Sequence, residues 1–387
     1  MKLNVTDYKV LEEIRINNRI SRIQLANMIG ITPAAITKII NKLLGLNLIF
    51  NNNILESKGG RPEKSLKINH KYKKIVGVNF GPEFIETSLS YLDGEIIAVQ
   101  RRNFYLRNQE KILRILFEEV EKILSGYDMT EILGLGLALH GTANKEKGIS
   151  VFSPHFGWKD FEIQKLLEKR YGIKVVLDND VRAMAIAEHE FGRGQDTDDF
   201  FMLHISNGVG GAIFLNGSTY EGINYSAGEI GHMIIKENSN IRCSCGKYGC
   251  LETEVSDEAI KSKVLYEMEK LGMEPDRSIK MDEIYNLGRQ KKEPFYSVIK
   301  ESSYETGKIL GNVLNILNIK LVVVAGKITD SGPVFFKFLE KGVKKTVLSG
   351  LENELVMVPS KFYDLIGIYG ALSLITTNLF KDRKLIG

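Results

Sequence analysis

The same plan of secondary structure occurs twice in this chain, and it constrains the fold more than any other feature of the sequence. Residues 75–102 contain an apolar strand, a glycine turn and two further strands, and residues 201–222 repeat that plan. Periodic segments near 108–124, 160–170, 181–191, 295–317 and 364–380 predict helices. Two α/β halves of this kind predict a mixed sheet in each half and a ligand cleft between them.

Positive charge is concentrated at the start of the chain. Residues 1–70 hold eleven Lys or Arg against five Asp or Glu, a net charge of +6, whereas the remainder of the 387 residues carries −2. A basic head on a near-neutral body is typical of a nucleic-acid-binding module. A chance excess of surface lysines is the alternative on charge alone. The length favours two or three domains.

The basic segment contains three short helical patterns. Val10, Leu11 and Ile14 share one face of the first helix. Ser21 and Gln24 form a capping box that begins the second helix, and Gly30 ends it. The residues that we expect this second helix to bury are Ile23, Leu25, Met28 and Ile29.

A third helix follows after a short turn. Thr32 is a capping residue, and Pro33 in the first turn loses no hydrogen bond. Its expected core positions are Ile36, Ile39, Ile40, Leu43 and Leu44. This helix, three-residue turn and helix predict a helix-turn-helix.

The outward face of the third helix combines small, polar and basic residues. Small residues allow close approach to a DNA groove, while Thr, Asn and Lys reach base edges and phosphates. A three-helix core with a solvated polar face is the alternative. The candidate DNA-binding residues are Thr32, Ala34, Thr37, Lys38, Asn41 and Lys42.

The next residues predict a β-wing. Leu48–Phe50 is followed by an expected turn of three asparagines, then Ile54–Leu55, then the glycine-rich segment SKGGRPEKSLKIN. Two glycines let the backbone lie close to a groove, and an arginine in a narrow minor groove gains from the negative potential there. A plain interdomain linker is the alternative. The candidate DNA contacts in the wing are Lys58, Gly60 and Arg61.

All three cysteines lie in one short segment. GHMIIKENSNIRCSCGKYGCLE offers four nitrogen or sulfur ligands within nineteen positions, namely His232, Cys243, Cys245 and Cys250. A Cys₃His set suits a closed, tetrahedral, structural Zn²⁺. An odd number of cysteines cannot pair completely, which favours a metal site in a cytoplasmic protein over disulfides. Three buried thiols are the alternative.

The sequence contains no apolar run long enough to span a bilayer, and its N-terminus lacks the apolar core of a signal peptide. We therefore expect neither membrane insertion nor export.

Three polar residues join a predicted strand to the helix near 181–191. Asp178, Asn179 and Asp180 could simply cap that helix. A carboxylate at the end of a strand, facing a cleft, could equally bind a sugar hydroxyl or remove its proton.

Together these features resemble the repressor branch of the ROK family (repressors, open reading frames and kinases). Its members join a winged helix-turn-helix to a sugar-kinase-like body of the actin-like ATPase fold. GGRP in the wing, LDND before a helix, and AGEIGH followed by CSCGKYGCLE carry the resemblance. It implies an α/β fold with a winged helix-turn-helix at 1–70, a first lobe at 71–190 and a second lobe with the zinc loop at 191–387.

The resemblance also implies a sugar site. Asp180 matches the catalytic base of kinase members and would be vestigial here, and His232 would be both a metal ligand and a neighbour of the sugar. His140 stands where the family has proline, and His155 where it has asparagine, which affects which sugar fits. The residues that match sugar-binding positions are Gly141, Asn179, Asp180, Glu229, His232 and Glu252.

The nucleotide side departs from the kinase pattern. Kinases of the family have Asp-x-Gly-Gly-Thr where this chain has Asn79-Phe80-Gly81-Pro82-Glu83. This change loses an aspartate that places Mg²⁺, and the proline removes a backbone donor. Glu83 adds a negative charge where phosphates would lie. The second phosphate loop begins with Ser206-Asn207, and the adenosine-side Gly-Gly is Ala325-Gly326. Phosphoryl transfer depends on positioning and charge neutralisation. ATP and Mg²⁺ are therefore not expected as cofactors, and any kinase activity would be residual.

We expect a sugar-responsive regulator of carbohydrate-utilisation genes, acting as a repressor, whose partners are operator DNA and a small sugar. A homodimer, or a tetramer, would place two heads on a pseudo-palindrome, and sugar would change the angle between the lobes. The alternative is an ATP-dependent kinase of a hexose or N-acetylhexosamine, which the retained Asp180 favours. A sugar-transport protein acting as inducer is a further possibility.

Overall fold

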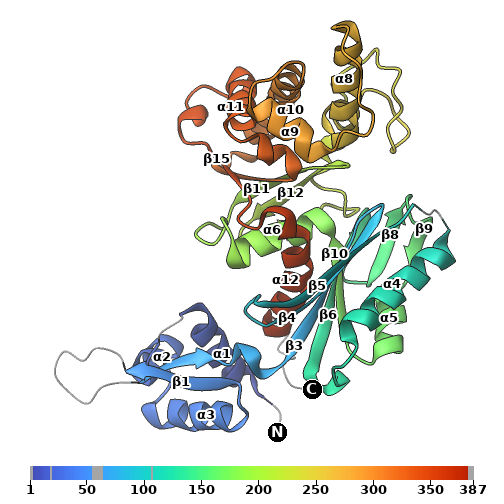
Figure 1. The fold of residues 1–387 in the computed structure, drawn as a ribbon. Coiled ribbons are helices and arrows are strands. Elements are labelled where there is room, and N and C mark those ends of the chain that lie inside the picture. Colours follow the sequence, from blue (N-terminus) through green and yellow to red (C-terminus); the bar gives the residue numbers. More distant parts are fainter. Residues whose placement is uncertain (1–2, 18–19, 55–63, 106–107, 382–387) are drawn as a thin grey trace.

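The computed structural model describes residues 3–17, 20–54, 64–105 and 108–381. The N-terminal residues form a small head, which lies against a body of two α/β lobes (Figure 1). The head consists of α1 (Val5–Ile16), α2 (Arg22–Ile29), α3 (Pro33–Gly45) and the antiparallel pair β1 (Ile49–Ile54) and β2 (Lys64–Ile68).

Local hydrogen bonds explain where the head helices begin and end. Ser21 and Gln24 form both bonds of the predicted capping box, and Gly30 ends α2 in the left-handed region at φ 74°. The Thr32 hydroxyl accepts from the backbone N–H of Ala35 at 3.3 Å. The predicted helix-turn-helix is confirmed.

Two expectations for the head are wrong. Ile23 and Met28 of α2 are 60% and 56% exposed, because the face of this short helix that meets the core is made by Leu25, Ala26 and Ile29. The expected asparagine turn is also wrong, since residues 51–53 lie within β1. Pairing with β2, in which Asn51 faces Leu66, outweighs the turn preference of asparagine.

Each lobe is built on a five-stranded mixed sheet, and the two sheets share one topology. The first has the order β10-β6-β3-β4-β5 and the second β13-β12-β11-β14-β15. In each, an antiparallel meander leads into two parallel strands. The duplicated plan is confirmed. The bounds are β3 (Lys74–Phe80), β4 (Phe84–Tyr91), β5 (Ile96–Asn103), β6 (Ile132–Leu139), β10 (Lys174–Asn179), β11 (Phe200–Ile205), β12 (Val209–Leu215), β13 (Ser218–Tyr220), β14 (Leu321–Ala325) and β15 (Val356–Pro359).

Helices cover both sheets, and a small three-stranded sheet extends the first lobe. The predicted helices correspond to α4 (Gln109–Leu124), α5 (Ile163–Tyr171), α6 (Asp180–Phe191), α10 (Phe295–Leu317) and α12 (Ile366–Lys381). Those not predicted are α7 (Glu252–Val255), α8 (Asp257–Lys270), α9 (Met281–Arg289) and α11 (Pro333–Thr346). The small sheet contains β7 (Thr142–Asn144), β8 (Ile149–Ser153) and β9 (Trp158–Phe161).

The C-terminal helix packs on the first lobe, so the boundary that assigns all of residues 191–387 to the second lobe is wrong. α12 lies across β3, β6 and β10 and beside α6 (Figure 1, dark red). Gly136 of β6 permits the approach, because a Cβ there would lie 1.8 Å from the carbonyl oxygen of Ala371. The sequence pattern of a helix does not indicate which sheet it covers.

The same helix joins the head to the body. One apolar core contains Leu11, Ile14 and Leu48 of the head together with Leu372 and Phe380 of α12. The head is therefore packed onto the body and is not suspended on a free linker.

No single helix among the described residues is long and apolar enough to cross a membrane. By length and composition alone, α2 and α3 together could form a broken span, with a bend of 115° between them. Buried core helices pass the same test.

Candidate functional site

The residues expected to bind sugar come from both lobes. Gly141 lies in the short connection between β6 and β7, and Asn179 and Asp180 form the junction of β10 and α6. From the second lobe, Glu229 precedes a short 3₁₀ helix (Ile230–His232), and Glu252 is the first residue of α7.

On the first-lobe side, three hydrogen bonds fix Asn179. Its side-chain amide donates to the carbonyl of Gly141 at 3.0 Å and to Asp180 Oδ1 at 2.9 Å, while its oxygen accepts from the N–H of Arg182 at 3.0 Å. Gly141 has φ 102°, and a Cβ there would lie 2.5 Å from the carbonyl oxygen of Phe152. Asn179 therefore caps α6, and the same bonds hold Asp180 in place at the end of β10.

His140 brings the two lobes into electrostatic contact. Its Nδ1 lies 3.5 Å from Asp180 Oδ2, and its ring meets that of His155 edge-on, with centroids 5.0 Å apart. Burial opposes its protonation, but the hydrogen bond to Asp180 and the charges of Asp180, Glu252 and Glu229 raise its pKa above the ordinary value. Asp180 thus pairs with this imidazole, and two carboxylates of the second lobe act on it through their charge.

Arg182 is a residue of this site that the sequence analysis missed. It is 2% exposed and forms an ion pair with Asp178, which is fully buried. Its other two nitrogens donate to the carbonyl of Ala143 in the first lobe, at 2.8 Å, and to that of Tyr225 in the second, at 2.7 Å. One buried side chain thus links the lobes beside Asp180. A lone arginine in an otherwise apolar helix face was the available signal.

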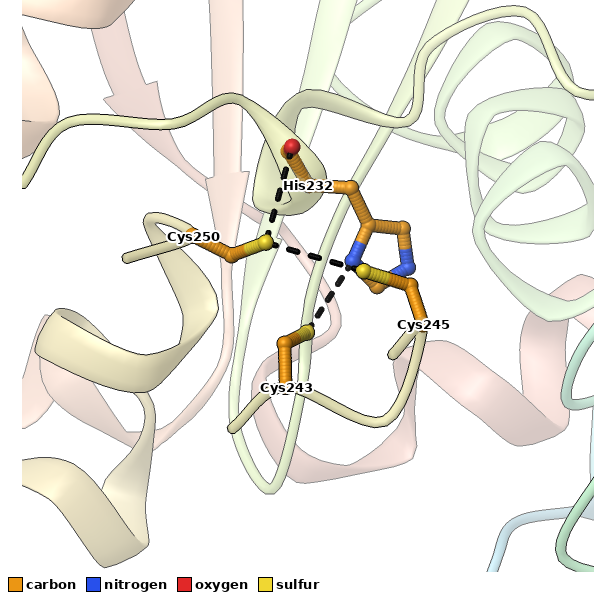
Figure 2. A group of neighbouring side chains, drawn as sticks. All are labelled: His232, Cys243, Cys245 and Cys250. Atoms are coloured by element: carbon orange, nitrogen blue, oxygen red, sulfur yellow. Dashed lines mark hydrogen bonds between the residues drawn. The ribbon is translucent and has the colours of Figure 1, made fainter. Parts of the chain in front are cut away.

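His232 and the three cysteines form a compact cluster, as predicted (Figure 2). Their four donor atoms lie within 4.8 Å of one another. His232 Nδ1 lies 3.4 Å from Cys243 Sγ, and the Sγ atoms of Cys245 and Cys250 are 3.6 Å apart. A tetrahedral Zn²⁺ with ordinary bond lengths places such ligand atoms about 3.5–3.8 Å apart. The donor set and its spacing therefore fit a structural zinc ion.

The cluster directly contacts two of the residues that we expect to bind sugar. The free ring nitrogen of His232, Nε2, lies 3.8 Å from a carboxylate oxygen of Glu229. Glu252 accepts from the Ser244 hydroxyl at 3.1 Å with one oxygen and from the N–H of Val209 at 3.2 Å with the other. A metal at this loop would thus orient two of the expected sugar-binding carboxylates.

The nucleotide side is occupied by interactions among the chain's own groups. The Asn79 amide donates to Glu86 at 2.8 Å, both side chains are buried, and Glu86 also accepts from Arg101 at 2.7 Å. An aspartate at position 79 would be repelled by Glu86. In the second loop, Val209 donates its backbone N–H to Glu252 at 3.2 Å.

The expected DNA-binding face is largely open. Ala34, Lys38 and Asn41 on α3 and the capping Thr32 are exposed. Thr37 is half-buried, and its hydroxyl donates to the carbonyl of Pro33 at 2.7 Å. Lys42 is also half-buried, and its ammonium binds the buried Asp7 at 2.6 Å. Lys58, Gly60 and Arg61 of the wing lie outside the described residues.

A winged helix-turn-helix on two lobes of duplicated actin-like topology, with a Cys₃His loop beside the lobe junction, defines a winged-helix protein with a sugar-kinase-like body. Comparisons with known proteins agree. Residues 3–49 match the winged helix-turn-helix DNA-binding family, and residues 75–378 match the ROK family. The chain belongs to the ROK family, as the sequence resemblance predicted.

Relatives that match almost the whole chain are named as transcriptional regulators. The xylose repressor of Bacillus subtilis (strain 168) is 28% identical over 353 residues, which are 91% of this chain and 89% of that protein. The DNA-binding transcriptional dual regulator NagC of Escherichia coli (strain K12) is 28% identical over 347 residues, 88% of this chain and 85% of NagC.

Solved structures show the same fold. A ROK family transcriptional regulator described as a homolog of the E. coli MLC protein superposes with a TM-score of 0.84 at 27% identity, covering 97% of this chain and 96% of its own. A ROK family glucokinase from Streptomyces griseus, in complex with glucose and AMPPNP, matches 78% of this chain and 98% of its own, with a TM-score of 0.70 at 22% identity.

Proposed function

We propose that the protein is a sugar-responsive DNA-binding transcriptional regulator that represses carbohydrate-utilisation genes. One observation carries the proposal: a helix-turn-helix with an open polar recognition face shares a continuous core with a body that gathers Asn179, Asp180 and His140 at its lobe junction. Relatives of similar length named xylose repressor and N-acetylglucosamine repressor support both halves of it.

In this proposal the first-lobe residues bind sugar hydroxyls. Asp180 and Asn179 accept and donate hydrogen bonds at the end of β10, and Glu229 and Glu252 approach from the second lobe. With the Mg²⁺-placing aspartate replaced by Asn79, Asp180 serves as a binding group and not as a base. The cluster of His232, Cys243, Cys245 and Cys250 would hold structural Zn²⁺, which would fix this wall of the pocket.

On the DNA side, α3 would enter the major groove, and the wing, with Lys58, Gly60 and Arg61, the adjacent minor groove. A homodimer would place two heads on a pseudo-palindromic operator. A sugar can shift operator affinity only by its differential binding to two states, and ~1–3 kcal/mol of coupling gives roughly 5–150-fold. Induction by a protein partner would act through the same two states.

Two matched variants test the DNA side. Operator sequences are first selected from random duplexes with the full-length protein, and affinity is then measured over a salt series. Lys38→Ala on α3 should weaken binding and reduce the salt slope by about one ion. Lys9→Ala removes the same charge from α1, where Lys9 is exposed, and should leave the slope unchanged. If no duplex is selected above background, the proposal is wrong.

The sugar side is tested by melting and by turnover. D-xylose, D-glucose and N-acetyl-D-glucosamine are added to the wild type and to Asp180→Asn. A sugar at about 100 times its Kd should stabilise the wild type by ~2.7 kcal/mol, and Asp180→Asn should lose this effect while it keeps operator affinity. ATP-dependent release of ADP with any of these sugars, at the ~10 s⁻¹ typical of enzymes, would establish the kinase alternative instead.

A further inference from the structure

Helix α6 has the expected sugar site at one end and the DNA-binding head at the other. Asp180 is its first residue, and Glu190 is the last but one. At 1.5 Å per residue, the two positions lie about 15 Å apart along the helix axis. No other helix among those described begins at the expected sugar-binding residues and ends in an ion pair with the head.

The first turn of α6 is hydrogen-bonded to both lobes, so it is sensitive to their relative position. Arg182 binds a carbonyl in each lobe, those of Ala143 and Tyr225, at 2.8 and 2.7 Å. A ligand that draws the lobes together or apart must therefore either move this turn of α6 or break one of these buried bonds. The same turn carries Asp180, so ligand contact and lobe position act on one short segment.

The body of α6 is held too tightly to absorb such a movement by bending. Met184, Ala185 and Ala187 are buried in one apolar cluster with strands of the second sheet, and α12 packs along the helix. Near the C-terminal end, the fully buried Glu188 accepts from the Ser360 hydroxyl at 2.5 Å and the Lys361 N–H at 3.1 Å. A displacement at the first turn is therefore expected to reach the last.

The last turn of α6 reaches the head through one ion pair. The guanidinium of Arg15, on α1, lies 2.6 Å from Glu190, whose side chain is only 9% exposed. Arg15 also stacks on Phe380 of α12 at 5.1 Å, and on its other side it binds Glu12 of its own helix at 2.8 Å. Burial opposes the charge of Arg15, but its bonds to Glu12 and Glu190 raise its pKa further above the ordinary value.

We propose that the Arg15–Glu190 ion pair positions the head according to the state of the sugar site, with α6 as the connecting element. Glu190 is thus a positioning residue for the response to sugar, although it contacts neither sugar nor DNA. This inference rests on the proposed function, since it specifies how that function is regulated.

Two variants of full-length protein separate this role from a general one. Glu190→Gln and Glu12→Gln each neutralise one carboxylate bound to the same guanidinium, but only the first lies on α6. Operator affinity is measured with and without D-xylose, D-glucose and N-acetyl-D-glucosamine at saturation, and sugar affinity is measured separately by calorimetry. The ratio of operator affinities with and without sugar is the quantity of interest.

Glu190→Gln should bind both operator and sugar, while its affinity ratio falls at least fivefold toward one. Glu12→Gln should keep the wild-type ratio, and Arg15→Lys, which retains a charge that can reach Glu190, should keep part of it. An unchanged ratio in Glu190→Gln, or an equal loss in both glutamine variants, overturns the inference. If the wild type itself binds no duplex, or responds to none of the three sugars, the proposed function fails first and the inference falls with it.

Discussion

His140 is the side chain through which pH should act on the sugar site. Its raised pKa means that the folded protein holds a proton on this imidazole more tightly than the unfolded chain does. The stabilising His140–Asp180 pair is therefore fully present below the unfolded pKa of about 6.5, and it is lost as pH rises through the higher folded pKa. Comparison with His140→Gln isolates this contribution.

We expect the difference in free energy of unfolding between wild type and His140→Gln to shrink as pH is raised from 6 to 9, as measured by urea denaturation. His204 provides the opposite control, because burial lowers its pKa. Relative to His204→Gln, the wild type should gain stability as pH rises from about 5 to 6.5, and the series for this control therefore starts at about pH 5. Parallel trends for the two histidines would contradict this assignment.

The buried ion pair of Arg182 and Asp178 leads to a prediction about the stability of the fold. Arg182→Met leaves the carboxylate of Asp178, which has no exposure, without its cation. Breaking a buried pair in this way costs about 3–5 kcal/mol, whereas replacing both members costs much less. The double variant Asp178→Asn/Arg182→Met should therefore be more stable than Arg182→Met alone. A loss below about 1 kcal/mol in the single variant would show that the pair is not held as the structure indicates.

If the Cys₃His loop holds Zn²⁺ as proposed, metal content should affect ligand binding. Residues 243–250 have little core of their own, and their cysteines converge on His232, which faces Glu229. An ion that binds only the folded state stabilises it by mass action, about 4 kcal/mol at 1,000 times its Kd. We expect chelation to lower the melting temperature and to weaken sugar binding, with operator binding less affected.

The measurements are zinc content by mass spectrometry, a thermal melt and calorimetric titration with sugar, before and after chelation. Restoring Zn²⁺ should reverse both effects. Cys245→Ser, which removes the exposed ligand, should reproduce them without a chelator. Unchanged sugar affinity in protein verified to lack zinc would refute the proposed link between the loop and the pocket wall.

The elements differ in how far the sequence alone could predict them. α10 is correct at both ends and α6 within one residue. Long apolar periodicity defines α10, which ends at Asn318 in the left-handed region, and the Asn179 side chain caps the start of α6. α7, α8, α9 and α11 were missed, although the buried positions of α11 recur every three or four residues and offered a usable signal. Ile23 and Met28 were misplaced because a helix of eight residues offers too few turns to fix its buried face.

Within the site, ligand types at close sequence spacing were predictable, and long-range partners were not. The four metal donors lie within nineteen positions, so their convergence could be foreseen. By contrast, Arg15 and Glu190 are 175 residues apart, and Arg182 reaches Ala143 and Tyr225 from a third segment. Nothing local distinguishes Arg15 and Glu190 from ordinary surface charges. Arg182 stands out in an otherwise apolar helix face, but the sequence does not indicate its partners.

For the molecule as a whole, the packing of the head onto the body should decide how operator DNA is read. The apolar core that joins Leu11 and Ile14 to Leu372 and Phe380 leaves no free linker on which the head could swivel. In a homodimer, the distance and the rotation between the two recognition helices would thus be set by the body. Half-sites would then be one or two turns of DNA apart, about 34 Å per turn.

Insertions between the half-sites of a selected operator test this rigidity. Five extra base pairs turn one half-site by about half a helical turn, onto the opposite face of the duplex, where a docked head cannot follow. We expect operator affinity to fall to that of an isolated half-site, as measured by fluorescence anisotropy, with the single half-site duplex as control. Ten extra base pairs restore the face but not the distance, so binding should remain weaker than to the original operator. Equal affinity for all spacings would mean that the heads move independently, and a sugar that alters lobe geometry would then have no route to the operator through the packed core.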